Sequence, residues 1–306
     1  MSVKKLDVLI PTYNRPYIFR YTVKRWLKSR YVSKIFVVAS ASDEKYFRQY
    51  KNTLMNLPSS RVIYELYPTK LTSVKARNRV LRFAHGHGSE IMLMAEDDFL
   101  PIEESLGYII EDFTKYENVG AVGGRVINIR RRRIDPDFYL NLPIADTLTK
   151  ITGYVFLDLK HGPRCTDFLT HFYAIKRDVA ERIEYDLIYD TPSAFREESD
   201  VHRQIKTLGY KLLYDPRVTV YHVSIDLGGC RAGMNEKQRF YWKSSNHTVF
   251  ILKHERFTAK RVWYLFSMMI ILLLYRPWYI HYVAKGLRDG LKTYKMKHVN
   301  AYNDLI

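Results

Sequence analysis

The sequence predicts an α/β protein in which a doubly wound, mostly parallel sheet is flanked by helices and followed by a C-terminal helical region. Short apolar runs alternate with longer amphipathic runs over the first 100 residues, two of the short runs are apolar on both faces, and the composition changes after residue 255. The 306 residues, of which 47% are hydrophobic, suffice for one large domain at 1–255 and a smaller helical region at 256–306.

The first 100 residues contain four predicted strands and three predicted helices. The strands are 6–10, 34–39, 61–66 and 91–95, and the helices between them are 16–29, 43–57 and 73–85. The runs 35–38 and 91–94 have no polar face, which is typical of strands inside a parallel sheet that helices cover on both sides. This order of strands and helices implies right-handed crossover connections.

The middle of the chain mixes the two kinds of element. We expect helices at 108–116 and 201–208 and strands at 121–127, 210–214 and 218–223. Gly209 is placed to end the second helix, and Asp215 and Pro216 separate the last two strands. The basic stretch 130–141 is typical of a loop.

The C-terminal region contains one long apolar run. Residues 262–275 are apolar except for Ser267, and Arg276 and Pro277 interrupt the run before it continues to Ala284. This run is short for a bilayer span, which needs about 20 predominantly apolar residues. Aromatic ends and basic residues on both flanks favour a segment, or two short helices meeting at the proline, that lies at a membrane interface. A buried helical hairpin or a dimer interface is the alternative.

The net charge of +17, with a pI near 9.6, describes a surface that attracts polyanions. Nucleic acid, anionic lipid head groups and phosphorylated substrates all satisfy this charge, so charge alone selects none of them. The two cysteines, Cys165 and Cys230, allow at most one disulfide bridge and no cysteine zinc cluster, which favours a reducing compartment. The apolar stretch 6–10 is too short for a signal peptide.

Three successive carboxylates, Glu96, Asp97 and Asp98, follow the apolar strand 91–95. Ligands of open α/β sheets bind outside the carboxyl ends of the strands, and a hard divalent cation bridging a diphosphate binds oxygens of this kind. An acidic loop that caps the next helix explains the same residues equally well.

A second acidic group, Glu197, Glu198 and Asp200, opens the predicted helix near residue 201. The helix dipole favours carboxylates there, so capping is one reading, and a general base that takes a proton from an acceptor hydroxyl is the other. Lys75 and Arg77 lie on the helix before the acidic strand and either face a diphosphate or form a solvated helix face.

The order and spacing of these motifs resemble glycosyltransferase family 2, whose members have the GT-A fold. The resemblance covers roughly residues 4 to 255 and is carried by the stretches 8–15, 75–78, 96–98, 197–200, 209–210 and 215–216, and by His222. Any one motif is weak evidence, but their shared order is specific.

The resemblance implies a metal site and a catalytic base. Glu96 and Asp98 match the two acids of the DxD motif, and His222 matches a histidine that completes the metal or diphosphate site, which implies Mg²⁺ or Mn²⁺ as cofactor. Asp97 is expected at the ribose or the metal. Glu198 falls where the family has its catalytic aspartate or glutamate, which makes it the expected base. Its neighbours Glu197, as the alternative base, and Asp200 complete the candidate catalytic group.

The expected donor-binding residues come from several motifs. The first strand and the third helix contribute Pro11, Thr12, Arg15, Arg77 and Asn78, to which Asp97 is added. After the second strand the family usually has an aspartate pair, and here only Asp43 is available to replace it. The glycine-rich segment 228–233 either closes over the donor with Arg231 or is a plain connection.

These expectations describe an inverting transfer of a sugar from a nucleotide-sugar donor to a hydroxyl acceptor on a lipid-linked or cell-surface glycan. The enzyme would be peripheral or monotopic on the cytoplasmic face of a membrane, in contact with its anionic surface and without a nucleic-acid partner. The rivals are a nucleotidyltransferase on a similar sheet and a non-enzymatic basic protein that binds nucleic acid or anionic membrane. Residues 11–16 contain no glycine, which argues against the phosphate loop that a nucleotidyltransferase would need.

Overall fold

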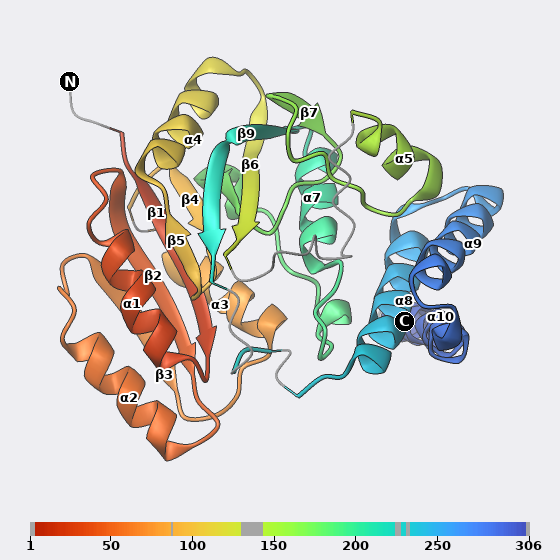
Figure 1. Ribbon diagram of the computed structural model, residues 1–306, viewed down its shortest axis with the longest axis horizontal. Helices are drawn as coiled ribbons and strands as arrows, with labels where there is room; N and C mark the ends of the chain where they lie inside the picture. The colour runs from red at the N-terminus through yellow and green to blue at the C-terminus, as the bar shows by residue number, and fades with distance from the viewer. Residues whose placement is uncertain (1–3, 87, 130–142, 224–227, 231–232, 304–306) are drawn as a thin grey trace.

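The computed structural model describes residues 4–86, 88–129, 143–223, 228–230 and 233–303, with side chains up to residue 297. The predicted loop at 130–141 and the candidate donor residue Arg231 lie outside the described residues. The described chain forms a sheet layer flanked by helices, with a group of C-terminal helices at one side (Figure 1).

The first third of the chain confirms the predicted alternation of strands and helices. The strands are β1 (Leu6–Tyr13), β2 (Val32–Ser40), β3 (Val62–Tyr67) and β4 (Ile91–Met94), and the helices are α1 (Pro16–Trp26), α2 (Glu44–Met55) and α3 (Ser73–Ala84). These strands pair in parallel in the order β3-β2-β1-β4. Each crossover helix therefore returns the chain to the same edge of the sheet.

The second part of the domain adds strands in both directions. Its strands are β5 (Phe99–Pro101), β6 (Val119–Asn128), β7 (Arg164–Thr166), β8 (Tyr173–Lys176) and β9 (Lys211–His222). The helices are α4 (Glu103–Lys115), α5 (Ala145–Thr152), α6 (Arg177–Ala180), the 3-10 turn η1 (Leu187–Tyr189) and α7 (Glu197–Thr207). β8 runs antiparallel between β4 and β6, and β5 runs antiparallel at the edge of β9. The nine strands found in the described residues therefore form a mixed sheet, whose N-terminal part, β1 to β4, is parallel.

The two strands expected around Asp215 and Pro216 are one strand, β9. It pairs in parallel with β6, and the register between them shifts at Gly124. A Cβ atom at Gly124 would lie 1.8 Å from the Val218 carbonyl oxygen, so only glycine admits this close approach. Strand β9 therefore continues past Pro216, and the register shift beside Gly124 accommodates the proline.

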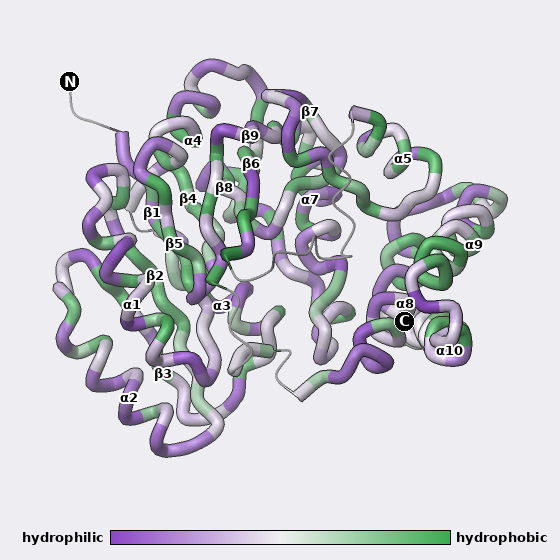
Figure 2. Tube along the Cα trace, viewed as in Figure 1, coloured by the Kyte–Doolittle hydropathy of each residue, from purple (hydrophilic) through white to green (hydrophobic). Residues whose placement is uncertain are grey.

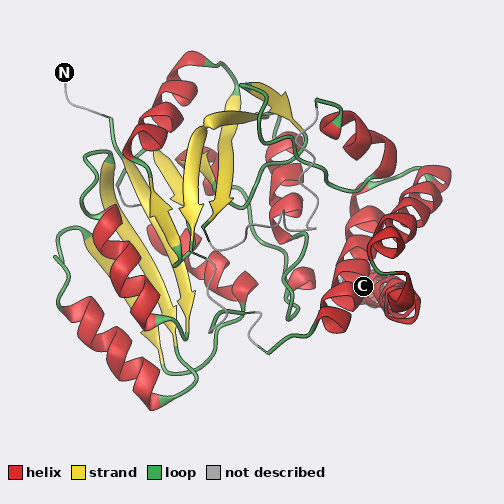
Figure 3. Cartoon of the chain, in the orientation of Figure 1, coloured by secondary structure: helices red, strands yellow, loops and turns green. Residues whose placement is uncertain are grey.

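Helices cover both faces of the sheet, as Figure 3 shows. Alternate residues of β2 enter opposite cores: Ile35 and Val37 pack with α1, α2 and α4, whereas Phe36 and Val38 pack with α3, α6 and α7. This double burial is why the strand has no polar face. Helices α4 and α7 begin several residues before the expected starts at 108 and 201. Acidic residues in their first turns stabilise each helix N-terminus before the apolar periodicity starts.

The C-terminal helices are α8 (Glu236–His254), α9 (Thr258–Tyr275), the 3-10 turn η2 (Pro277–Tyr279) and α10 (Ile280–Asn303). A capping box between Asn235 and Gln238 begins α8. Gly286 and Gly290 let α10 approach α8 closely, because a Cβ atom at either would lie within 2.6 Å of an α8 carbonyl oxygen. α9 and α10 meet at Pro277, as the sequence predicts, and the proposed domain boundary at residue 255 falls between α8 and α9.

Helix α9 exposes an apolar face. Phe266, Ile270 and Leu274 recur every four residues and are 53%, 42% and 78% exposed. α9 is also the one helix of the described chain that is long and apolar enough to cross a membrane, with 22% of its window buried. Figure 2 shows this concentration of hydrophobic residues at the side of the molecule.

Candidate active site

The first acidic segment lies where β4 leaves the centre of the sheet. Residues 96–98 form a short turn between β4 and β5. β5 pairs antiparallel with β9, and the register sets Phe99 opposite His222. Strand pairing therefore places Asp98 beside a histidine that is 124 residues away in the sequence.

Glu96, Asp98 and His222 form a compact group of ligand atoms, all within 4.8 Å of one another. His222 Nε2 is 3.1 Å from Asp98 Oδ2, while His222 Nδ1 is 2.6 Å from the side-chain oxygen of Asn128. If Nδ1 carries the proton that this short contact needs, a neutral imidazole presents its Nε2 lone pair to the carboxylate. The lone pairs of His222 Nε2 and Asp98 Oδ2 would repel each other at this distance, so a proton or a cation must lie between these two atoms.

A divalent cation fits this group of side chains. Asp98 Oδ1 is buried and has no hydrogen-bond partner, which leaves a carboxylate oxygen available for a metal. The Asn128 contact orients the imidazole, as outer partners of metal-binding histidines do. Burial lowers the pKa of His222, but the hydrogen bond and charge of Asp98 outweigh burial and raise it. Two carboxylates and one imidazole offer the oxygen and nitrogen ligands that a divalent cation can use.

Arg15 and Thr12 connect β1 to the acidic segment. Arg15 Nη1 lies 2.8 Å from Asp98 Oδ2 and 3.3 Å from Asp97 Oδ1, and Thr12 donates to Asp97 Oδ2 over 2.6 Å. The Tyr50 hydroxyl contacts both Thr12 Oγ1 and the Arg15 main-chain nitrogen. Burial and the Asp98 charge raise the pKa of Asp97 to about 7. Asp97 thus ties the end of β1 to the turn after β4.

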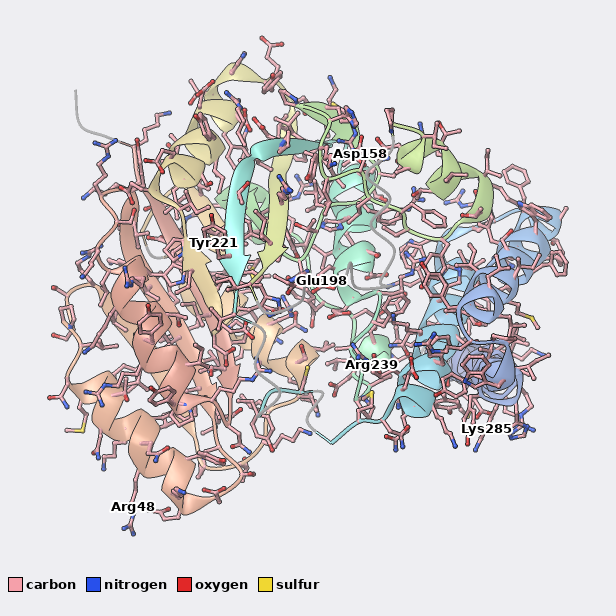
Figure 4. All side chains as sticks on the ribbon, viewed as in Figure 1. Arg48, Asp158, Glu198, Tyr221, Arg239 and Lys285 are labelled. Carbon is pink, nitrogen blue, oxygen red and sulfur yellow. The ribbon has the colours of Figure 1, made fainter. Side chains whose placement is uncertain are left out.

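Arg77 joins the two acidic groups. Its Nη2 lies 2.9 Å from Glu96 Oε1 and 3.1 Å from Glu198 Oε1, and the residue is only 4% exposed. A buried cation of this kind is retained because carboxylates surround it. Figure 4 places Glu198 where α7 begins, between the central strands and the C-terminal helices. From the sequence, Arg77 was predicted either to bind the donor or to lie on a solvated helix face. In the structure Arg77 links Glu96 to Glu198.

The other two acids of the second group lie on different sides of α7. Glu197 is buried and contributes to the charge around Arg77. Asp200 is also buried, and its carboxylate contacts Lys253 and His254 of α8. Of the three candidate catalytic residues, Glu198 alone forms an ion pair with Arg77 in the described structure.

The remaining expected donor residues divide into two groups. Pro11 lies half-buried on β1, and Asp43 is exposed, where it caps α2 by accepting from the Tyr46 main-chain nitrogen over 2.9 Å. Asn78 is buried, and both atoms of its amide bond the main chain of Tyr185. Asn78 therefore holds the segment before η1 in place, while Asp43 stays at the carboxyl edge of β2.

His171 was not singled out in the sequence. It lies just before β8, with its ring centroid 5.4 Å from that of Phe99 and 6.1 Å from that of His222. Burial lowers the pKa of His171, so the imidazole stays neutral beside the metal-ligand group. No local motif marks this residue, because only the insertion of β8 between β4 and β6 brings it to the site.

Several solved structures of glycosyltransferases share this fold. The mannosyltransferase PcManGT from Pyrobaculum calidifontis, in complex with GDP-Man and Mn²⁺, aligns with a TM-score of 0.58 and 16% identity, covering 100% of this chain and 82% of that chain. S. aureus TarS 1–349 in complex with UDP-GlcNAc has a TM-score of 0.58 and 14% identity, covering 94% and 81%. GalNAc-T7 with UDP, GalNAc and Mn²⁺ has a TM-score of 0.56 and 13% identity, covering 86% and 55%.

The fold is therefore that of GT-A glycosyltransferases. The chain itself belongs to the glycosyl transferase family 2, whose family model matches residues 7–184, more than half of its length. No curated protein sequence matches it. The match includes Glu96 and Asp98 and ends before Glu198 and His222, so the latter two enter the site through the geometry described above.

Asp98→Asn is expected to lower Mn²⁺ affinity by at least about tenfold, because it removes the charge of the most buried ligand while keeping its shape. Calorimetric titration of Mn²⁺ into the folded variant measures this effect. Glu44→Ala, an exposed carboxylate on α2, is the matched control and should leave affinity unchanged. Equal Mn²⁺ affinity in Asp98→Asn and the wild-type protein would exclude this group as the metal site.

Proposed function

We propose that this chain is an inverting, metal-dependent glycosyltransferase that moves a sugar from a nucleotide-sugar donor to a hydroxyl of a membrane-linked glycan. The observation that carries the proposal is the juxtaposition of the Glu96, Asp98 and His222 group with Glu198 across Arg77. One group suits the leaving diphosphate, and the other offers a carboxylate for the acceptor.

The donor side of the site is formed by the ends of β1, β2 and β4. Glu96, Asp98 and His222 would hold a divalent cation, which supplies positive charge that neutralises the leaving nucleoside diphosphate. Arg15, already beside Asp98, adds a guanidinium at the same edge. Thr12 and Asp43 lie toward the carboxyl ends of β1 and β2, where nucleotides bind to open α/β sheets. The bound GDP-Man and UDP-GlcNAc of the structural neighbours support a nucleotide-sugar donor.

Glu198 is the proposed base. Its carboxylate accepts the proton of the acceptor hydroxyl while the acceptor oxygen bonds to the anomeric carbon and the bond from that carbon to the diphosphate oxygen breaks. A single displacement of this kind inverts the anomeric carbon and needs one base opposite the leaving group. Arg77 holds Glu198 at a fixed distance from Glu96, so the base and the metal ligands keep their relative position.

A donor screen tests this function directly. The purified chain is incubated with Mn²⁺ and each common nucleotide sugar, and release of the nucleoside diphosphate is measured with and without added glycan or lipid-linked acceptors. We expect one donor to be turned over and turnover to stop with a chelator. Turnover that survives complete metal removal would contradict the metal role, and the absence of turnover with every donor would contradict the function.

Glu198→Gln is expected to lower kcat by about 10²- to 10⁴-fold with little change in the KM for the donor, because a base acts on the acceptor and not on the donor. Steady-state kinetics with the donor found in the screen measure both constants. Glu197→Gln is the matched comparison on the same turn. A larger fall in kcat for Glu197→Gln would exchange the two assignments, and a raised donor KM in Glu198→Gln with unchanged kcat would remove Glu198 from this role.

We also propose that the exposed face of α9 lies in an anionic membrane interface. Phe266, Ile270 and Leu274 form its apolar centre, and Trp278 continues it on η2. Basic residues lie around the start of α9 and along α10, namely Arg256, Lys260, Arg261, Lys285, Arg288, Lys292, Lys295 and Lys297. Apolar side chains between cations match the acyl and head-group layers of one leaflet.

The position of Arg276 supports a helix α9 that lies in the membrane interface over one that crosses the bilayer. It separates α9 from α10 and forms an ion pair with Glu236, with its Nε 3.1 Å from Glu236 Oε1. A span that extended beyond α9 would place these charges in hydrocarbon, which is expensive. In the interface they stay hydrated while α9 keeps its apolar face in lipid, and the active site stays near a lipid-linked acceptor on the cytoplasmic face.

The double variant Phe266→Asp with Leu274→Asp is expected to weaken binding to vesicles that contain an anionic lipid by at least about tenfold, because each substitution removes an exposed apolar side chain whose burial in lipid would contribute about 1.5 kcal/mol or more. Vesicle co-sedimentation measures this loss, and Met55→Asp on α2 is the exposed apolar control. A C-terminal tag that proteases reach only from the far side of sealed membranes would establish a span and contradict the interfacial proposal. Complete release of the wild-type chain by salt alone would leave only electrostatic attachment.

A further inference from the structure

We infer that Arg196 and Asp200 are positioning residues through which helix α8 fixes the orientation of Glu198. The inference rests on the proposed function, because it assigns a role to the support of the proposed base. Arg196 precedes Glu197 and Glu198 at the start of α7, and Asp200 lies one turn after Arg196. Both side chains point to α8, whereas Glu198 between them contacts Arg77 of α3.

Arg196 occupies an unusual position for a charged residue. Its backbone has φ 78°, in the left-handed region, and the residue is 3% exposed. Among the described residues no carboxylate lies within 4.0 Å of its guanidinium, which instead packs against aromatic rings, the nearest being Phe250 of α8 at 4.8 Å. A left-handed non-glycine residue costs about 1–3 kcal/mol. A buried cation without a counter-ion adds a further cost.

The guanidinium of Arg196 forms hydrogen bonds to α8, to the end of α5 and, from Nη1 over 3.4 Å, to the Ser199 hydroxyl of α7 itself. Arg196 Nε donates to His247 Nδ1 over 3.1 Å, and Nη2 donates to the carbonyl oxygen of Gly153, the C-cap of α5, over 3.1 Å. Burial, followed by the Arg196 charge, holds the pKa of His247 well below its usual value, so His247 stays neutral and accepts the bond. The hydrogen bond thus requires a charged Arg196 and a neutral His247.

A second contact lies one turn further along α7. The carboxylate of Asp200 is 2.6 Å from His254 Nε2 and 2.8 Å from Lys253 Nζ. Asn246 adds a third contact, donating to the Phe195 carbonyl oxygen over 3.0 Å, immediately before Arg196. These α8 residues recur at the spacing of one helix face. A single face of α8 therefore contacts the chain both before and after Glu198.

These contacts orient the start of α7 more than they secure α7 as a whole. Val201 and Ile205 anchor the body of the helix in the core that covers the sheet. Loss of the Arg196 contact should therefore leave α7 folded and loosen its first turn, where Glu198 lies. Arg77 would still hold Glu198 from α3, and Asp200 would still contact α8, but the contact to α8 before Glu198 would be weakened.

Arg196→Met tests the inference, because it removes a buried unpaired cation while keeping much of the side-chain volume. Removing the buried charge relieves its desolvation, whereas losing the bonds to His247 and Gly153 costs stability, so we expect only a small change in Tm. We expect kcat to fall at least about tenfold, a shift of about 1.4 kcal/mol, with the donor KM unchanged. Amide hydrogen exchange at 197–200 should become faster. Arg196→Lys, which keeps a donor toward His247, should recover part of kcat.

Arg203→Met is the matched control, since Arg203 lies on the same helix and rests over Phe168. It should change neither kcat nor exchange at 197–200. If Arg196→Met keeps wild-type kcat and exchange while the wild-type enzyme turns over its donor, the positioning role is wrong and the proposed function stands. If the wild-type chain turns over no donor, the function fails and the positioning role fails with it.

Discussion

Glu96, Asp97 and Asp98 stand side by side at the end of a buried strand, where each carboxylate needs compensating positive charge. Arg15 from the start of α1 supplies it on one side and Arg77 from α3 on the other. Each arginine therefore draws a neighbouring element toward the acidic turn. The position of Glu198 follows from the same requirement, because Arg77 pairs with it as well.

The C-terminal helices are connected to this arrangement through α8. One face of α8 contacts residues on both sides of Glu198, and α8 also packs against α10, which approaches closely at Gly286 and Gly290. The exposed apolar face of α9 is attached to the same helical group. The helices proposed to lie at a membrane thus share a rigid contact with the turn proposed to carry the base, which would place the site at a defined height above the surface.

Much of the site was visible in the sequence because its residues lie in contiguous motifs. The three predicted metal ligands do lie together, and Glu96 and Glu198 do face a shared arginine. His171, Asn128 and Tyr50 were not anticipated. Each belongs to a segment without a local signature and reaches the site only through strand insertion or packing between helices. Asp200 has the residue type of a catalytic group, yet its partners on α8 become visible only in the folded chain.

The sequence by itself determined the parallel half of the sheet, the crossover helices and the break at Pro277, because local hydrophobic periodicity and backbone chemistry specify these elements. Tertiary structure alone decided the antiparallel insertion of β8, the continuity of β9 past Pro216 and the partners of Arg77 and Arg196. Charge in a sequence shows that a residue needs a partner. Which partner it finds depends on contacts between segments far apart in the chain, and these form only when the apolar faces are buried together.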